Sequence, residues 1–401
     1  MKAALFLVFA GCVAALNNGL ALTPPMGFNP WNCCGETSEG TKKLPSGRLG
    51  YNQTFIQNIG SIIASSPLKD AGFEYVNLDC GYSTGFRDAS GHIIVNTTTF
   101  PDLKGLADYL HSHGLKFGIY SSASPAQCCS HIHPGANDGS YRHEALDAEW
   151  FASIGVDYLK YDECKAIESS YTTMRNALNS TGRPIVYTVH GPKGEGAIAL
   201  ANTWRTTGDI TNSFSSILSR ARENNKLAQW AGPGHWNQAD MLEVGNYPLT
   251  DAESRTHFSL WCLMKSPLLI GHDLTNTSER TVAAMSILGN TDAIAINQDP
   301  LGVQGIMVQD APDFQTWAGP LSSGDFTAAL VNLAKTNGAQ MTLTLTMADL
   351  TMSAPNATLA DVYSVQDLWL HEPVAQKLSA STNVTVEVAY HDVAFLRLTP
   401  A

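Results

Sequence analysis

Short apolar segments alternate with helix-like segments over most of this 401-residue chain, and this alternation restricts its fold more than any other feature. The expected strands are residues 26–31, 73–79, 115–120, 156–162, 184–190, 203–209, 234–240 and 268–273. Between most of them apolar residues recur at helical spacing, as in the expected helices 102–113 and 141–154. Strand–helix units repeated over ~250 residues favour an eight-stranded parallel (β/α)8 barrel over an open sheet.

The pattern changes after Pro300. The later segments are rich in β-forming residues and are expected at 314–317, 326–333, 341–347, 362–369 and 384–398. Apolar and polar residues alternate strictly from Thr342 to Thr346, and glycine-containing turns separate the segments. We predict that residues 306–401 form an antiparallel β-sandwich, packed closely on a barrel of residues 22–305.

The N-terminus has the pattern of a secretory signal peptide. Lys2 precedes an apolar run at 3–16 that contains small residues around 11–15. A membrane anchor is the alternative, but the run is shorter than the ~20 residues needed to span a bilayer. We therefore predict a signal peptide at 1–21, cleaved within 15–21, and a secreted, extracellular protein.

Cysteines and glycosylation motifs agree with that location. Removal of Cys12 leaves seven of the eight cysteines, and an oxidising compartment favours disulfides among them. Cys262 lies in the apolar helical run 258–264 and is expected to be the buried, unpaired thiol. The candidate glycosylation sites are Asn52, Asn96, Asn179, Asn276, Asn356 and Asn383.

The charge of the chain excludes some classes of partner. Its 24 Lys and Arg face 36 Asp and Glu, which gives a net charge of −12. Nucleic acids require a basic surface, and anionic membranes are disfavoured for the same reason. We expect an uncharged substrate and no nucleic-acid or membrane partner, while the oligomeric state stays unknown.

Polar and aromatic residues gather where the expected strands end. They are Trp31, Asp79, Lys160, Asp162, His190, Asp209, Asp240 and Asp273. The C-terminal face of such a barrel carries the active site. Each Asp could instead cap the following helix, but capping alone does not explain the same pattern after so many strands.

Two of these carboxylates suggest a reaction. Asp162 follows Lys160 by two residues, and the neighbouring charge would keep it ionised, as a nucleophile requires. Asp209 lies two strands later at the same rim. Two carboxylates across one pocket can hydrolyse a glycoside, one attacking the anomeric carbon and one protonating the leaving oxygen. The alternative is a pair of helix caps or ion-pair partners.

Several segments, in order along the barrel, resemble family 27 glycoside hydrolases, the secreted α-galactosidases (melibiases) and α-N-acetylgalactosaminidases. They are residues 22–32 (LTPPMGFNPWN), 114–120 (GLKFGIY), 158–162 (YLKYD), 230–234 (WAGPG) and 295–302 (AINQDPLG). The C-terminal region resembles the family's second domain in type and length only. The resemblance implies a secreted, retaining exo-glycosidase that removes terminal α-D-galactose from oligosaccharides, polysaccharides or glycoconjugates by double displacement. It implies no metal and no organic cofactor.

The resemblance also implies roles. Asp162 is similar to the family's nucleophile and Asp209 to its acid/base, and retention requires carboxyl groups about 5–5.5 Å apart. The implied substrate-binding residues are Trp31, Asp79, Lys160, His190, Arg205 and Asp240. Among these, Trp31 would form a wall of the pocket, and Arg205 would lie near the sugar's 2-hydroxyl.

Disulfides are implied in the same way. The candidates are Cys33, Cys34, Cys80, Cys128, Cys129 and Cys164. One cysteine of the 128–129 pair would bridge to Cys164 and one of the 33–34 pair to Cys80, and we expect the two left over to join each other. The run 128–133 (CCSHIH) could instead hold zinc, but its spacing is not that of a zinc finger, and we expect no metal.

Two positions depart from the family pattern. Many members carry a second Asp where this chain has Cys80, so either one sugar-binding carboxylate is missing or Asp79 does both jobs. His190 replaces an acidic residue that holds the 2-hydroxyl, and Ala201 replaces a cysteine. His190 is then either a donor to the sugar or a structural histidine.

These departures leave alternatives open. A β-L-arabinopyranosidase or an α-N-acetylgalactosaminidase of the same family would use the same mechanism on another sugar. A catalytically silent sugar-binding homologue and a metal-dependent barrel hydrolase are the alternatives of a different kind.

Overall fold

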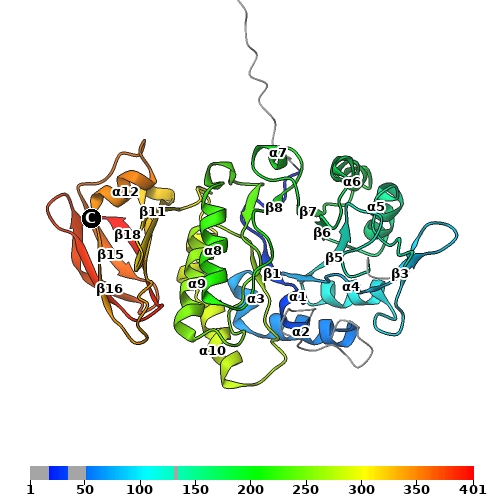
Figure 1. Cartoon of the computed structure of the whole chain (residues 1–401), viewed down its shortest axis with the longest axis horizontal. Coiled ribbons are helices and arrows are strands. Elements are labelled where there is room, and N and C mark those ends of the chain that lie inside the picture. The colour runs from blue at the N-terminus through cyan, green and yellow to red at the C-terminus, as the bar shows by residue number, and fades with distance from the viewer. Residues whose placement is uncertain (1–17, 35–50, 131–133) are drawn as a thin grey trace, which may run out of the picture.

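The computed structural model describes residues 18–34, 51–130 and 134–401, and its larger part is an eight-stranded parallel barrel (Figure 1). In sheet order the strands are β10 (Leu268–Ile270), β1 (Met26–Phe28), β2 (Tyr75–Asn77), β5 (Lys116–Ser122), β6 (Tyr158–Asp162), β7 (Val186–Val189), β8 (Thr203–Arg205) and β9 (Trp236–Gln238). A parallel bridge between Leu242, after β9, and Ile270 completes the circle. Each expected strand is present, so the predicted barrel is confirmed.

Helices surround these strands. They are α1 (Trp31–Cys34), α2 (Gln53–Ser65), α3 (Pro67–Ala71), α4 (Leu103–Ser112), α5 (Glu144–Ser153), α6 (Glu168–Ser180), α7 (Glu195–Ile198), α8 (Phe214–Asn225), α9 (Asp251–Leu263), α10 (Glu279–Leu288) and α11 (Thr291–Asn297). The expected helix 102–113 is α4, and Asp102 caps it by accepting from the backbone N–H of Gly105 at 2.8 Å. The expected helix 141–154 is α5, which begins three residues later than predicted.

A hairpin of β3 (Ser83–Arg87) and β4 (Ile93–Val95) is inserted after β2 and was not predicted. The Arg87 guanidinium donates to both carboxylate oxygens of Asp147 in α5, at 2.6 and 2.7 Å. Both side chains are buried, so this bidentate pair fixes the hairpin to the helix layer.

The period-two alternation of a strand sorts its side chains between two environments. In β6, Leu159 and Tyr161 are buried in the core between strands and helices. Tyr158, Lys160 and Asp162 therefore share the opposite face, which lines the barrel interior. Tyr158 lies at the N-terminal end of the strand and Asp162 at its C-terminal end. The alternation in YLKYD therefore places the charged residues Lys160 and Asp162 toward the C-terminal end of the barrel interior.

The first described residues belong to the barrel. The carbonyl oxygen of Ala21 accepts from Nε1 of Trp236 at 2.7 Å, and the side-chain amides of Asn18 and Asn202 bond each other. Residues 1–17 of the predicted signal peptide lie outside the described residues, so that segment stays a prediction. Within the described ranges, no helix combines the length and apolarity that crossing a membrane requires.

The C-terminal part is antiparallel throughout, which confirms the predicted sandwich class. One sheet holds six strands in the order β11 (Ile306–Asp310), β12 (Phe314–Pro320), β13 (Phe326–Asn332), β18 (Val393–Pro400), β15 (Val362–Asp367) and β16 (Glu372–Ser379), and the other pairs β14 (Met341–Leu345) with β17 (Val384–Val388). Strands β11 and β16 and the short helix α12 (Met347–Ser353) were not predicted, and the expected segment 384–398 is divided into the two strands β17 and β18. Both missed strands are edge strands with largely unburied side chains, so they carry little apolar pattern.

The sandwich packs against α8 and α9 of the barrel (Figure 1). Trp317 and Phe395 of the sandwich are fully buried in the same hydrophobic cluster as the barrel helices. Arg255 in α9 pairs with Asp392 at 2.5 Å across the junction. The predicted close packing of the two parts is confirmed.

The glycosylation candidates differ in exposure. Five of the asparagines are exposed: Asn52, Asn179, Asn276, Asn356 and Asn383. Asn96 is buried, with 6% of its surface exposed. Asn96 is therefore the least accessible of the six candidates, and all six stay predictions.

Candidate active site

A pocket of about 250 Å³ opens at the C-terminal ends of the barrel strands. All the expected site residues line it: Trp31, Asp79, Lys160, Asp162, His190, Arg205, Asp209 and Asp240. Asp273, at the end of β10, does not; its Oδ1 accepts from the backbone N–H and hydroxyl of Thr275, which makes it a turn residue. The lining residues that the sequence analysis missed are Cys80, Tyr120, Cys128, Glu163, Cys164 and Met241.

Asp162 is held at both carboxylate oxygens. Its Oδ1 accepts from the backbone N–H of Glu163 at 2.9 Å, and its Oδ2 accepts from the hydroxyl of Tyr120 at 2.8 Å. Burial raises the pKa of Asp162, but the hydrogen bond from His190 and the charge of Lys160 lower it by more. The net pKa lies well below the usual range, so Asp162 is ionised at neutral pH.

His190 bridges two carboxylates. Its Nδ1 lies 2.9 Å from Oδ1 of Asp162, and its Nε2 lies 3.1 Å from Oε1 of Glu163. Both ring nitrogens of His190 therefore face carboxylate oxygens. A sugar hydroxyl would have to displace one carboxylate to reach His190, which the sequence analysis did not foresee.

Lys160 forms an ion pair with Asp79, which follows β2. Its Nζ donates to Oδ2 of Asp79 at 2.7 Å, and that oxygen also accepts from Nδ2 of Asn29 at 2.8 Å. Burial lowers the pKa of Lys160, but the charges of Asp79 and Asp162 raise it by more, to above its usual range. Lys160 therefore stays charged between the two carboxylates.

Arg205 contacts two further carboxylates of the pocket. Its Nη2 lies 3.0 Å from a carboxylate oxygen of Asp209 and 3.0 Å from one of Asp240. The side chain of Asp240 is buried, whereas that of Asp209 is 67% exposed at the mouth. Burial raises the pKa of Asp209, but the charges of Arg205 and Lys160 lower it by more, so this carboxyl is also ionised here.

Two disulfides shape the rim: Cys128–Cys164 and Cys80–Cys129. The expected bridge from the 128–129 pair to Cys164 is confirmed. The expected bridge from Cys33 or Cys34 to Cys80 is wrong, because Cys80 pairs with Cys129, and no cysteine of the 128–129 pair remains to join the other pair. The reason is topological: β2 and β5 are neighbours in the sheet, so the residues that follow them meet. Cys262 is buried and outside any disulfide, as expected.

One group of potential metal ligands lies in the described part of the chain: Cys128, Cys164 and Asp162, with ligand atoms within 4.8 Å of one another. The two sulfur atoms are joined as a disulfide and are therefore not the thiolates that bind metals. His131 and His133 of the alternative zinc reading lie outside the described residues.

A buried carboxyl behind the pocket wall was also missed. Glu243 accepts from the side-chain amides of Asn246, at 2.5 Å, and of Asn32, the neighbour of Trp31. Burial raises the pKa of Glu243 to about 7, against the effect of these two hydrogen bonds. Glu243 thus connects the wall that carries Trp31 to the loop that carries Asp240.

Known proteins are similar to this chain over most of its length. The chain matches the family model described as "Alpha galactosidase A" over residues 23–299 and that described as "Alpha galactosidase C-terminal beta sandwich domain" over residues 311–398. It is 40% identical over 395 residues to a protein from Oryza sativa subsp. japonica named "Alpha-galactosidase", covering 96% of this chain and 87% of the relative.

Solved structures of α-galactosidases are also similar to this chain. The structure of alpha-galactosidase I from Mortierella vinacea is similar with a TM-score of 0.82 and 32% identity, covering 96% of this chain and 99% of the other. That of the Saccharomyces cerevisiae α-galactosidase with raffinose is similar with a TM-score of 0.82 and 28% identity, again covering 96% and 99%.

Proposed function

This chain belongs to the alpha galactosidase A family of glycoside hydrolases, and we propose on that premise that it removes terminal α-D-galactosyl residues with retention of configuration. The observation that carries the proposal is that Asp162 and Asp209 both line one pocket of about 250 Å³. The names of the relatives, and the raffinose in the yeast structure, support galactosides as the substrate class.

The first step forms a covalent intermediate. Asp162 attacks the anomeric carbon, Asp209 gives its proton to the leaving oxygen, and the galactosyl group becomes an ester on Asp162. For this double displacement the two carboxyl groups should lie about 5–5.5 Å apart. In the second step Asp209 takes a proton from water, which attacks the same carbon and releases Asp162.

Asp209 must carry a proton to act as an acid, yet Arg205 holds it ionised. The family resemblance implies that Arg205 lies near the sugar's 2-hydroxyl. If that hydroxyl accepts from Arg205 in place of Asp209, one of the interactions that lower the pKa of Asp209 is lost, and this pKa rises as the sugar binds. Arg205 thus couples sugar binding to the supply of the proton.

Secretion is part of the proposal. The N-terminal pattern supports it, as do the two disulfides at the rim and the five exposed sequons. No metal and no organic cofactor takes part in the mechanism that we propose.

The direct test is a set of initial rates on nitrophenyl glycosides of α-D-galactose, α-N-acetylgalactosamine and β-L-arabinopyranose. We expect the α-D-galactoside to be cleaved with the highest kcat/KM and to release α-galactose first. A preference for either of the other two sugars would change the proposed substrate but leave the proposed mechanism unchanged. A folded protein that cleaves none of the three would overturn the proposal and favour a silent sugar-binding homologue.

His190 should set the acidic limit of activity. We expect His190→Ala to move the acidic limb of the kcat/KM profile to higher pH, because it removes the hydrogen bond that lowers the pKa of Asp162. A higher pKa of the nucleophile means that protonation inactivates the enzyme at a higher pH. Rates measured from pH 3 to 7 test this, and an unshifted limb would contradict this role of His190.

A further inference from the structure

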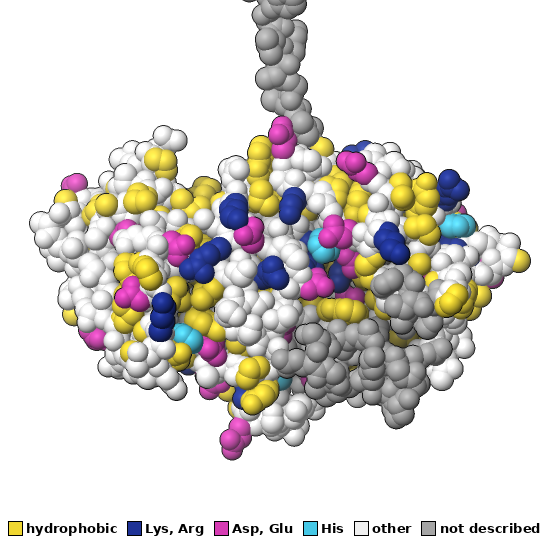
Figure 2. All heavy atoms as spheres, viewed as in Figure 1, with side chains coloured by type: hydrophobic (Ala, Val, Ile, Leu, Met, Phe, Trp, Pro, Cys, Tyr) yellow, Lys and Arg dark blue, Asp and Glu magenta, His cyan; other side chains and the backbone are white. Residues whose placement is uncertain are grey.

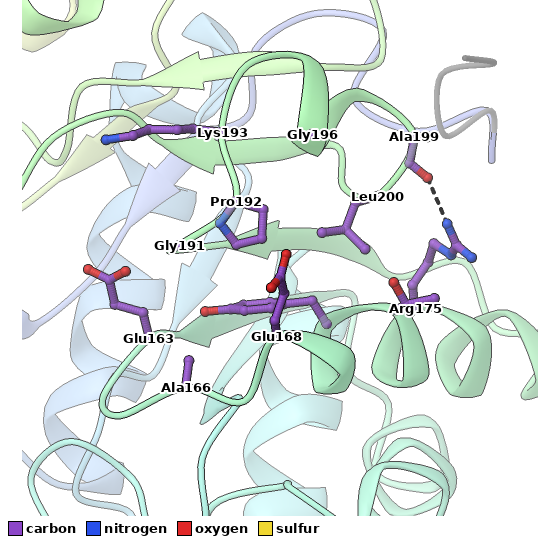
Figure 3. A pocket seen from close by; sticks show the side chains of 12 residues that line it. Glu163, Ala166, Glu168, Arg175, Gly191, Pro192, Lys193, Gly196, Ala199 and Leu200 are labelled. Carbon is purple, nitrogen blue, oxygen red and sulfur yellow. Dashed lines mark hydrogen bonds between the residues drawn. The ribbon is translucent and has the colours of Figure 1, made fainter. Parts of the chain in front are cut away.

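A second cleft, of about 590 Å³, lies beside the sugar pocket (Figure 3). One wall is α6 with the turn before it, and the other is the turn from β7 into α7. Glu168 points from the first wall toward Pro192 and Leu200 of the second, and Arg175 donates to the carbonyl oxygen of Ala199 at 2.9 Å at one end. The cleft is thus bounded by two well-packed segments of the barrel.

The cleft continues from the sugar pocket. Glu163 lines both, and its carboxylate contacts His190 at 3.1 Å. Gly191, the next residue, lines the cleft, and the hydroxyl of Tyr171 donates to the carbonyl oxygen of His190. The two turns that form one side of the pocket therefore also form the entrance to the cleft.

The lining suits an uncharged polyhydroxyl ligand. Tyr171 and Leu200 are buried and give the cleft an apolar base. Its charged side chains balance, since Glu163 and Glu168 face Arg175 and Lys193. An apolar base with a few polar groups at the edge is how proteins hold neutral ligands, and a balanced edge does not favour a phosphate or an acidic peptide.

We propose that this cleft binds the leaving part of an oligosaccharide, the sugars that follow the terminal galactose; the proposal rests on the proposed function. The cleft has more than twice the volume of the pocket, about 590 against 250 Å³. If the pocket holds one ring, the cleft has room for two more. A trisaccharide such as raffinose then fills pocket and cleft together.

The experiment compares two neighbouring threonines on α6, both exposed. Thr172 lines the cleft and Thr173 does not, so Thr172→Trp fills the cleft while Thr173→Trp is its matched control. Gly196→Trp fills the cleft from the other wall, where a Cβ would meet nothing within 4 Å. For each variant, kcat and KM are measured on raffinose and on nitrophenyl α-D-galactoside, whose leaving group is one aromatic ring.

We expect Thr172→Trp and Gly196→Trp to lower kcat/KM for raffinose by about tenfold, mainly through KM, with the nitrophenyl substrate within about twofold of wild type. Thr173→Trp should match wild type on both substrates. Equal raffinose kinetics for Thr172→Trp and Thr173→Trp, or equal losses on both substrates, would overturn the inference. In either case a wild type active on the nitrophenyl galactoside leaves the proposed function intact; a wild type active on neither substrate removes both.

Discussion

Asp162→Asn is expected to lower kcat on nitrophenyl α-D-galactoside by about 10⁴-fold or more, the size of effect seen when a covalent nucleophile is removed. An amide keeps the shape of the carboxylate but cannot form the glycosyl ester. Tyr120 and His190 would still face the side chain, so the pocket should keep its form. We expect KM to change far less than kcat.

Asp273→Asn is the matched control. It makes the same chemical change at another strand end, outside the pocket, where an amide oxygen can still accept from Thr275. Its kcat should equal that of wild type, and thermal melting should show that both variants are folded. If Asp162→Asn kept more than about a hundredth of the activity, the nucleophile would have to be another residue.

The barrel and its pocket could be predicted from the sequence because its apolar residues recur with the period of strands and with that of helices. The strand period of two puts Lys160 and Asp162 on the same interior face, and parallel strands bring their C-terminal ends to one rim. Side chains that end different strands therefore had to converge. Asp273 is the exception: it forms a turn and lies outside the pocket, and the following helix α10 is capped by Ser278.

What could not be predicted depends on contacts between loops. The choice of Cys129 over Cys33 or Cys34 as partner of Cys80 depends on which loops meet above the sheet. The bridge from Glu163 through His190 to Asp162 depends on side-chain rotamers at the ends of β6 and β7. Neither carries a periodic signal, and a sequence motif supplies residue types but not their pairing.

Asp209→Ala should give the second large effect, and its size should depend on the leaving group. A general acid contributes about 10²–10⁴-fold, and a leaving group that is already a good one does not need its proton. We expect the loss in kcat/KM to be close to 10⁴-fold on raffinose and much smaller on a dinitrophenyl galactoside. On the activated substrate the glycosyl ester on Asp162 should accumulate, because no base remains to activate water.

Azide separates this role from that of Asp162. A small anion needs no base, so it should attack the glycosyl ester, restore turnover of Asp209→Ala on the activated substrate and give α-galactosyl azide, the configuration of the substrate. Asp273→Asn and wild type should form none. A β-galactosyl azide would mean that Asp209, not Asp162, is the nucleophile, and the absence of any rescue would remove Asp209 from the acid/base role. The two carboxylates are thus told apart by the stereochemistry of one product.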